Sequence, residues 1–122
     1  MARTPAPIDL TSYYGQPVLI AATATLGQLV YSVVAAGAQW ERVRVLAWHN
    51  DIAVDHTLTL EVTDTDGATV FGTLSRVFGA TENYIEFIAG WKLRQPCELR
   101  FYADTTNIIY VKPEFELELP IA

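Results

Sequence analysis

Cysteine and basic residues are scarce in this chain of 122 residues. Cys97 is its single cysteine, so no internal disulfide can form and nothing indicates export to an oxidising compartment. Eight Lys and Arg stand against 14 Asp and Glu, which gives a net charge of −6 at pH 7. A nucleic-acid surface needs clustered basic side chains, so this charge argues against nucleic acid as a partner. We expect a protein made in a reducing compartment.

Long apolar runs are also absent. The longest fall short of the roughly 20 residues that a membrane-spanning helix needs, so we expect no membrane partner. The segment from Met1 to Pro7 lacks the apolar centre of a signal peptide. Because 51% of the residues are hydrophobic and 18% are charged, the composition predicts a soluble domain with a packed core.

Helical periodicity is the third absence. No window carries apolar residues at i, i+3, i+4 and i+7, so we predict no helix longer than one or two turns. Short alternating segments are present instead, and they predict strands at residues 17–24, 29–34, 39–50, 57–63, 68–75, 84–89, 97–104 and 109–119. About eight such strands predict an all-β protein, an antiparallel β-sandwich or jelly roll, in a single domain over residues 17–122.

Residues 1–16 differ from this domain. Pro5 and Pro7 favour extended backbone around themselves, and no period is sustained, so we predict an extended N-terminal arm. Its large apolar side chains are Ile8, Leu10, Tyr13 and Tyr14. We predict that they anchor the arm on a neighbouring subunit or coat protein. The alternative is that the arm packs along its own sandwich as an extra edge strand.

A hairpin organises the middle of the chain. Polar and apolar residues alternate from Thr57 to Thr63, and Asp64–Gly67 supplies turn chemistry. A three-residue loop with a left-handed glycine places Val62 opposite Val70 and Leu58 opposite Leu74. A four-residue loop would place Val62 opposite Thr69 and mix the two faces, so we predict the three-residue register.

The strand predicted at residues 39–50 carries large side chains on both faces. One face holds Val43, Val45 and Ala47 together with His49. The other face, which we call the outward row, holds Trp40, Arg42, Arg44, Leu46 and Trp48. Such a strand is central in a two-layer structure or has one face covered by a partner. Since Trp and Arg are enriched at interface hot spots, we predict that the outward row is a partner interface. The alternative is that the row packs against the second sheet, with its arginines at the rim.

Two groups of residues have some resemblance to metal sites. The first brackets one loop and consists of His49, Asp51, Asp55 and His56. Its histidines lack the i, i+2 or i, i+4 spacing that aims two rings at one point, which favours loop-flanking polar residues. The second, Asp64–Gly67, resembles the opening of a calcium loop, but Arg76 stands where the closing region needs an acid. We predict a hairpin turn there, and neither metal nor cofactor.

Catalytic arrangements are not evident. The strand predicted at residues 97–104 alternates and places Cys97, Leu99, Phe101 and Ala103 inward. At such a position cysteine is usually an inert small hydrophobe. The serines, Ser12, Ser32 and Ser75, lack a Gly-x-Ser-x-Gly context. The glutamates between residues 114 and 118 are typical of a solvated strand face, and Pro113 predicts an edge strand or a bulge at that point. We therefore predict that the chain is not an enzyme, and keep a metal-dependent enzyme as the third hypothesis.

Several short features follow one another between Leu26 and Leu119. They are Tyr31, Ala35-Ala36-Gly37, a strand ending Ala47-Trp48-His49-Asn50, Thr57-Leu58-Thr59-Leu60, Gly79-Ala80-Thr81, and Leu93 before Leu99-Arg100-Phe101-Tyr102-Ala103-Asp104. Their order resembles that of a small sandwich fold common among tailed-bacteriophage virion proteins. In such proteins the segment before the last strand often reads Leu-x-x-Gly-Asp, whereas here it is Leu93-Arg94-Gln95-Pro96-Cys97.

The resemblance implies a virion structural protein made in the host cytoplasm, and we expect a capsid decoration subunit. Its partners would be coat subunits and copies of itself in a homo-oligomer, with binding that is cooperative through many weak contacts. A neck or tail component of the virion is one alternative. Another is a carbohydrate-binding sandwich module with exposed Trp and Tyr as stacking platforms.

Overall fold

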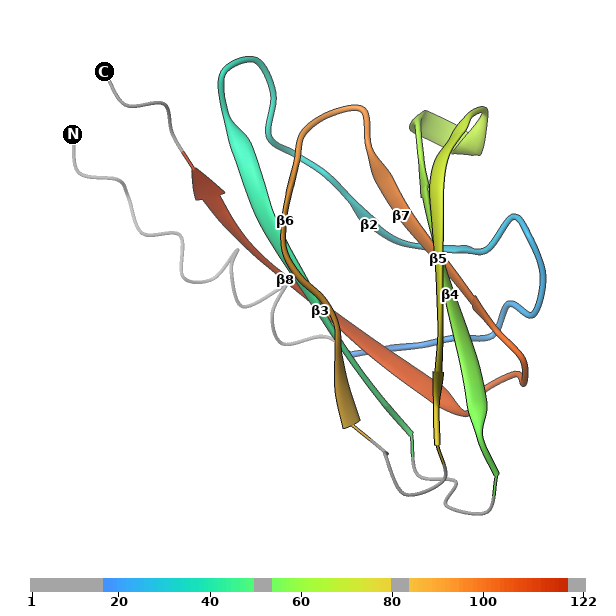
Figure 1. Cartoon of the computed structure of the whole chain (residues 1–122). Helices are drawn as coiled ribbons and strands as arrows, with labels where there is room; N and C mark the ends of the chain where they lie inside the picture. The colour runs from blue at the N-terminus through green and yellow to red at the C-terminus, as the bar shows by residue number, and fades with distance from the viewer. Residues whose placement is uncertain (1–16, 50–53, 80–83, 119–122) are drawn as a thin grey trace.

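The computed structural model describes residues 17–49, 54–79 and 84–118 of the chain (Figure 1). These residues form eight strands and one short 3-10 turn, η1 (Thr65–Gly67). The strands are β1 (Val18–Leu19), β2 (Gln28–Ser32), β3 (Trp40–His49), β4 (His56–Thr63), β5 (Val70–Phe78), β6 (Tyr84–Leu93), β7 (Glu98–Ala103) and β8 (Ile109–Glu118). The predicted all-β fold is confirmed.

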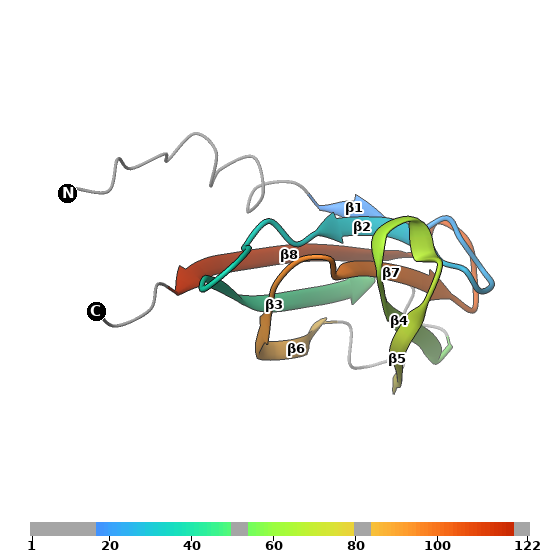
Figure 2. The same ribbon diagram turned by 90° about the horizontal axis from the view of Figure 1, so that it is seen from above.

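The strands form two antiparallel four-stranded sheets, in the orders β1-β8-β3-β6 and β2-β7-β4-β5. Successive strands alternate between the sheets except at the β4–β5 hairpin, and the strands nearest the two ends of the chain lie side by side in the pair β1–β8. This connectivity is that of a jelly roll. Figures 1 and 2 show the two layers, with β5 and β6 at one margin of the molecule.

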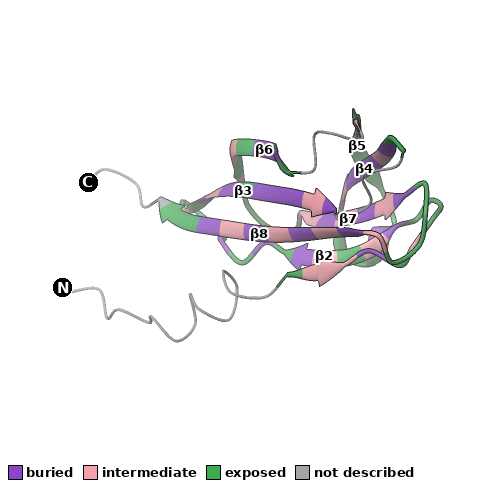
Figure 3. Ribbon diagram, turned by 90° about the horizontal axis from the view of Figure 1, so that it is seen from below, coloured by how far each residue is buried: buried purple, intermediate pink, exposed green. Residues whose placement is uncertain are grey.

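The core lies between the two inner faces. Leu58, Leu60 and Phe101 of one sheet are fully buried, as are Val43 and Val45 of the other. The predicted inward parity of β3 and β7 is therefore confirmed. Figure 3 shows β3 buried along most of its length, whereas β8 becomes exposed toward its C-terminal end.

The predicted register of the β4–β5 hairpin is wrong. Val62 lies opposite Gly72, and Leu60 rather than Leu58 lies opposite Leu74. The reason is a longer connection, in which η1 inserts a turn and a register shift follows Val62. Because Leu60↔Leu74 differs from the predicted register by two residues, the apolar side chains still face the core.

The prediction that Pro113 lies on an edge strand or at a bulge needs a correction. β8 is an inner strand of its sheet, between β1 and β3. However, β1 is short, and its pairing with β8 covers only Tyr110 and Val111. Pro113 therefore lies on a stretch of β8 whose described pairing is with β3 alone, which is compatible with the missing N–H.

Two buried carboxylates hold the connections that flank β2. Glu41 accepts hydrogen bonds from the hydroxyl of Tyr31 and from the backbone N–H of Val34 and of Ala35, the latter at 2.8 Å. Glu61 accepts from the hydroxyl of Thr25 and, at 2.7 Å, from the N–H of Gly27. Both side chains are almost completely buried, so their hydrogen bonds replace water that the fold has removed.

Candidate interaction surface

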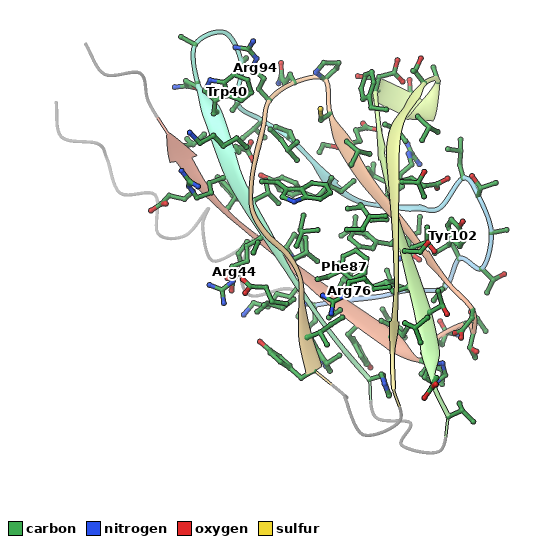
Figure 4. The ribbon with its side chains drawn as sticks, in the orientation of Figure 1. Trp40, Arg44, Arg76, Phe87, Arg94 and Tyr102 are labelled. Carbon is green, nitrogen blue, oxygen red and sulfur yellow. The ribbon has the colours of Figure 1, made fainter. Side chains whose placement is uncertain are left out.

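The outward row lies on the outer face of its sheet, away from the inter-sheet core. Val43, Val45 and Ala47 belong to the core cluster, and no member of the row does. Figure 4 shows Arg44 pointing away from the second sheet, whereas Phe87 lies between the sheets. The alternative in which the row packs against the second sheet is therefore wrong. We call the outer surface of β8, β3 and β6 the outer β3 face.

The members of the row differ in exposure. Trp40 is 36% exposed, and the side chain of Arg44 is 52% exposed. Arg42 and Trp48 are half-buried. Leu46, by contrast, is only 7% exposed, because its neighbours on the outer β3 face include the long side chains of Lys112 and Glu86. Leu46 is thus a poorly accessible member of the predicted interface.

Three aromatic rings lie side by side at one end of the outer β3 face. The indole of Trp48 stacks on Tyr110 of β8 with centroids 5.7 Å apart and planes inclined by 9°. On its other flank it stacks on Tyr84 of β6 at 6.3 Å. Tyr84 is 58% exposed. These tyrosines were not among the predicted site residues, because the cross-strand register that places them beside Trp48 is not a local property of the sequence.

Charged side chains occupy the middle of the outer β3 face. Arg44 lies 2.8 Å from a carboxylate oxygen of Glu86 and 3.8 Å from one of Glu114, which itself lies 3.5 Å from the amine of Lys112. An open depression of about 380 Å³ adjoins these groups, lined by Arg42, Arg44, Gly90, Glu114, Phe115 and Glu116. Because cations and carboxylates alternate across the strands, this part of the surface carries less negative charge than the chain as a whole.

Trp40 occupies the other end of the outer β3 face. The guanidinium of Arg94 lies over its indole, 4.1 Å from the ring centroid, and donates a hydrogen bond of 2.7 Å to the carbonyl of Gly37 (Figure 4). The loop before β7 thereby covers one side of the indole. The stacked guanidinium is a preorganised cation–π pair with part of the indole accessible.

The two histidines meet inside the molecule, which the sequence did not predict. His49 and His56 are 1% and 2% exposed, with ring centroids 4.9 Å apart in an edge-to-face arrangement. His56 Nδ1 lies 3.1 Å from a carboxylate oxygen of Asp104. Asp51 lies outside the described residues, and Asp55 is exposed. Within residues 17–49, 54–79 and 84–118 no group of three or more His, Cys, Asp or Glu is placed to hold a metal ion.

The remaining candidates have structural roles where they are described. Asp64 accepts a hydrogen bond of 2.8 Å from the N–H of Thr69, so its carboxylate closes the hairpin turn. Cys97 is half-buried and packs against the core. The four predicted arm anchors, Ile8, Leu10, Tyr13 and Tyr14, lie outside the described residues.

Within the described part of the chain, no helix has the length and apolar character needed to cross a membrane. Comparison with protein-family models, with curated proteins and with solved structures finds no match to the chain.

Proposed function

We propose that this chain is a non-enzymatic structural protein of a tailed-phage particle, in which it acts as a capsid decoration subunit through protein–protein contacts. The observation that carries this proposal is the outer β3 face. There, Trp40, Arg44, Trp48 and Tyr84 are gathered on a sheet surface outside the core. Trp, Tyr and Arg are the side chains that dominate protein–protein hot spots.

The fold supports the same proposal by analogy alone. Viral capsid proteins are among those that use the jelly roll, but so are lectins and cupins, so topology does not choose between these classes. A decoration subunit needs no catalytic group. It needs a preformed surface, and the aromatic row and the ion pairs of the outer β3 face provide one.

The particle location is tested with particles purified from a lysate that contains this chain. Quantitative mass spectrometry should find the chain in a fixed ratio to the coat protein, and antibodies against it should label the head. Labelling of the neck or tail would replace the decoration role with a different virion role. Absence of the chain from purified particles would overturn the proposal.

A carbohydrate-binding module is the second candidate, because the row Tyr84–Trp48–Tyr110 is a partly exposed aromatic array. The ring geometry makes it the weaker one. A sugar stacks on a ring face, and Trp48 has a tyrosine on each flank, which leaves mainly the indole edge for a ligand. Saturable binding on a glycan array that Trp48→Ala abolishes would favour this candidate over protein–protein contacts.

A further inference from the structure

Strand β5 is an edge strand with little of the usual protection against pairing with another chain. It lies at the margin of the sheet β2-β7-β4-β5, and among the described residues only β4 pairs with it (Figure 2). From Gly72 to Phe78 this pairing is regular, and the register shift lies at its start. The strand contains no proline and no acidic residue, and Arg76 is its single charge. Phe71 and Val77 are 56% and 60% exposed.

The other edges in the described residues are protected. β1 has two residues, and β2 has five with a register shift between Leu29 and Tyr31. β6 carries register shifts and the left-handed Gly90, together with charged side chains. The part of β8 beyond β1 contains Pro113 and glutamates. Short strands, bulges, proline and charge are the devices by which edges avoid pairing. On β5 these devices are reduced to the register shift at its start and to Arg76, and the stretch from Gly72 to Ser75 has none of them.

The backbone of β5 shows which residues face the open edge. The N–H of Asp104 donates to the carbonyl of Thr57, so odd-numbered residues of β4 direct their backbone groups toward β7. Backbone groups alternate sides along a strand, so the even-numbered residues of β4 pair with even-numbered residues of β5. Thr73, Ser75 and Val77 consequently direct their N–H and C=O groups to the open edge.

We infer that β5 pairs with β5 of a second copy, antiparallel about a two-fold axis at Leu74. In this register Thr73 of each copy forms a hydrogen-bonded pair with Ser75 of the other, and each such pair exchanges two N–H···O bonds. Leu74 meets its own equivalent at the axis. Because the contact is isologous, both open edges are used and the assembly closes as a dimer.

The side chains are complementary in the same register. Val77 of each copy comes beside Phe71 of the other, which lies at the register shift just before the regular stretch, so two exposed apolar side chains cover each other. Aromatic with β-branched pairs and Thr with Ser pairs are both favourable across strands. Arg76 lies opposite Gly72 of the other copy, which brings no side chain against it, and its guanidinium donates a hydrogen bond of 3.2 Å to the carbonyl of Glu86 of its own chain.

The self-contact adds to the proposed function without depending on it, because β5 belongs to the sheet that does not carry the outer β3 face. Sedimentation equilibrium over a concentration series should show a monomer–dimer equilibrium. Val77→Lys should weaken the association constant about tenfold or more, since it removes two apolar pairs. Leu29→Lys is the matched control, because it makes a similar change at the other edge of the same sheet, where Leu29 is 46% exposed. It should leave the association constant unchanged.

Cross-linking tests the register directly, in a Cys97→Ser background. A mixture of Thr73→Cys and Ser75→Cys chains should form a disulfide-linked heterodimer, whereas neither variant should link to itself. A chain that stays monomeric, an association equally sensitive to Leu29→Lys, or open-ended aggregation in place of a dimer would overturn the inference. Self-linking of either cysteine variant would overturn the register. Failure of the particle-binding experiments would leave this dimer untouched, so the two proposals fail separately.

Discussion

At the scale of single residues, the buried carboxylates do more for the fold than the exposed charges. Glu41 and Glu61 each accept hydrogen bonds from two or more donors that lie outside their own strand, in place of the water that folding removes. An orphaned donor in such a place costs the full desolvation penalty, whereas an exposed ion pair such as Arg44–Glu86 contributes little. The sequence showed these glutamates only as acidic residues in alternating segments.

Glu41→Ala should therefore destabilise the protein strongly. The change removes the shared acceptor of the Tyr31 hydroxyl and of two backbone amides, and we expect a loss of about 2–5 kcal/mol in the free energy of unfolding. Urea denaturation measures this loss. Glu116→Ala makes the same chemical change on the exposed surface and should have little effect. Equal effects of the two variants would contradict the role assigned to Glu41.

Cys97 should react slowly. Burial raises the pKa of its thiol above the ordinary value, and a hydrogen bond with the backbone of Arg94 offsets part of this rise. Since a raised pKa keeps the sulfur as the neutral thiol to higher pH, the thiolate fraction near neutral pH is smaller than in free cysteine. Alkylation by iodoacetamide should be slower in the folded protein than in urea, with its pH profile displaced toward alkaline pH. A folded protein that reacts as fast as the unfolded chain would contradict this expectation.

At the scale of elements, the segment between β1 and β2 lies along strand β7 of the other sheet. The N–H of Ala103 donates to the carbonyl of Ala22, and Gly27 donates to Glu61 across β7. The approach at Gly27 is close, because a Cβ built there would lie 2.5 Å from the carbonyl oxygen of Phe101. The sequence predicted a strand at residues 17–24, but β1 stops at Leu19 because the chain then crosses from one sheet to the other.

Gly27→Ala should lower the free energy of unfolding by about 1–3 kcal/mol, since the loop or β7 must shift to admit the methyl group. Gly72→Ala is the control, because no atom lies within 4 Å of its built Cβ, and we expect equal or slightly higher stability. Thermal unfolding in dilute solution compares the two. Equal melting temperatures for Gly27→Ala and the unchanged protein would show that the loop shifts without a loss of stability, which would contradict this prediction.

At the scale of the whole molecule, the two proposed contact surfaces lie on different sheets. The outer β3 face is aromatic and ionic, whereas β5 presents a nearly uncharged edge in the opposite sheet. The proposed partner contact and the proposed self-contact therefore use separate surfaces. A decoration subunit that binds a particle and also a copy of itself needs this separation.

Trp48→Glu should leave a folded protein that no longer binds its particle. The variant places a carboxylate in the aromatic row and loses two ring contacts, which together should cost about 1–3 kcal/mol of stability. Cosedimentation with particles that lack this chain measures the binding. Val54→Glu, at a residue 51% exposed outside the outer β3 face, is the control and should bind normally.

Retained particle binding by Trp48→Glu would move the interface elsewhere. A variant that fails to fold would show that the aromatic row belongs to the stability of the sheet rather than to a partner. Dimer formation through β5 should persist in Trp48→Glu, because Trp48 and β5 lie in different sheets.

The sequence by itself determined the local properties of this protein. Alternation with a period of two residues is set by the pleat of a single strand, so the all-β fold and the two faces of β3 could be read from it. The same reasoning placed Leu99, Phe101 and Ala103 inside.

The tertiary structure alone decided the properties that depend on neighbouring strands. The hairpin register depends on the conformation of η1, and the row Tyr84–Trp48–Tyr110 depends on which strands flank β3. The contact between His49 and His56, and the position of β5 as a weakly protected edge, follow from sheet order in the same way. These are contacts between segments distant in sequence, and the period of a single strand contains no information about its neighbours.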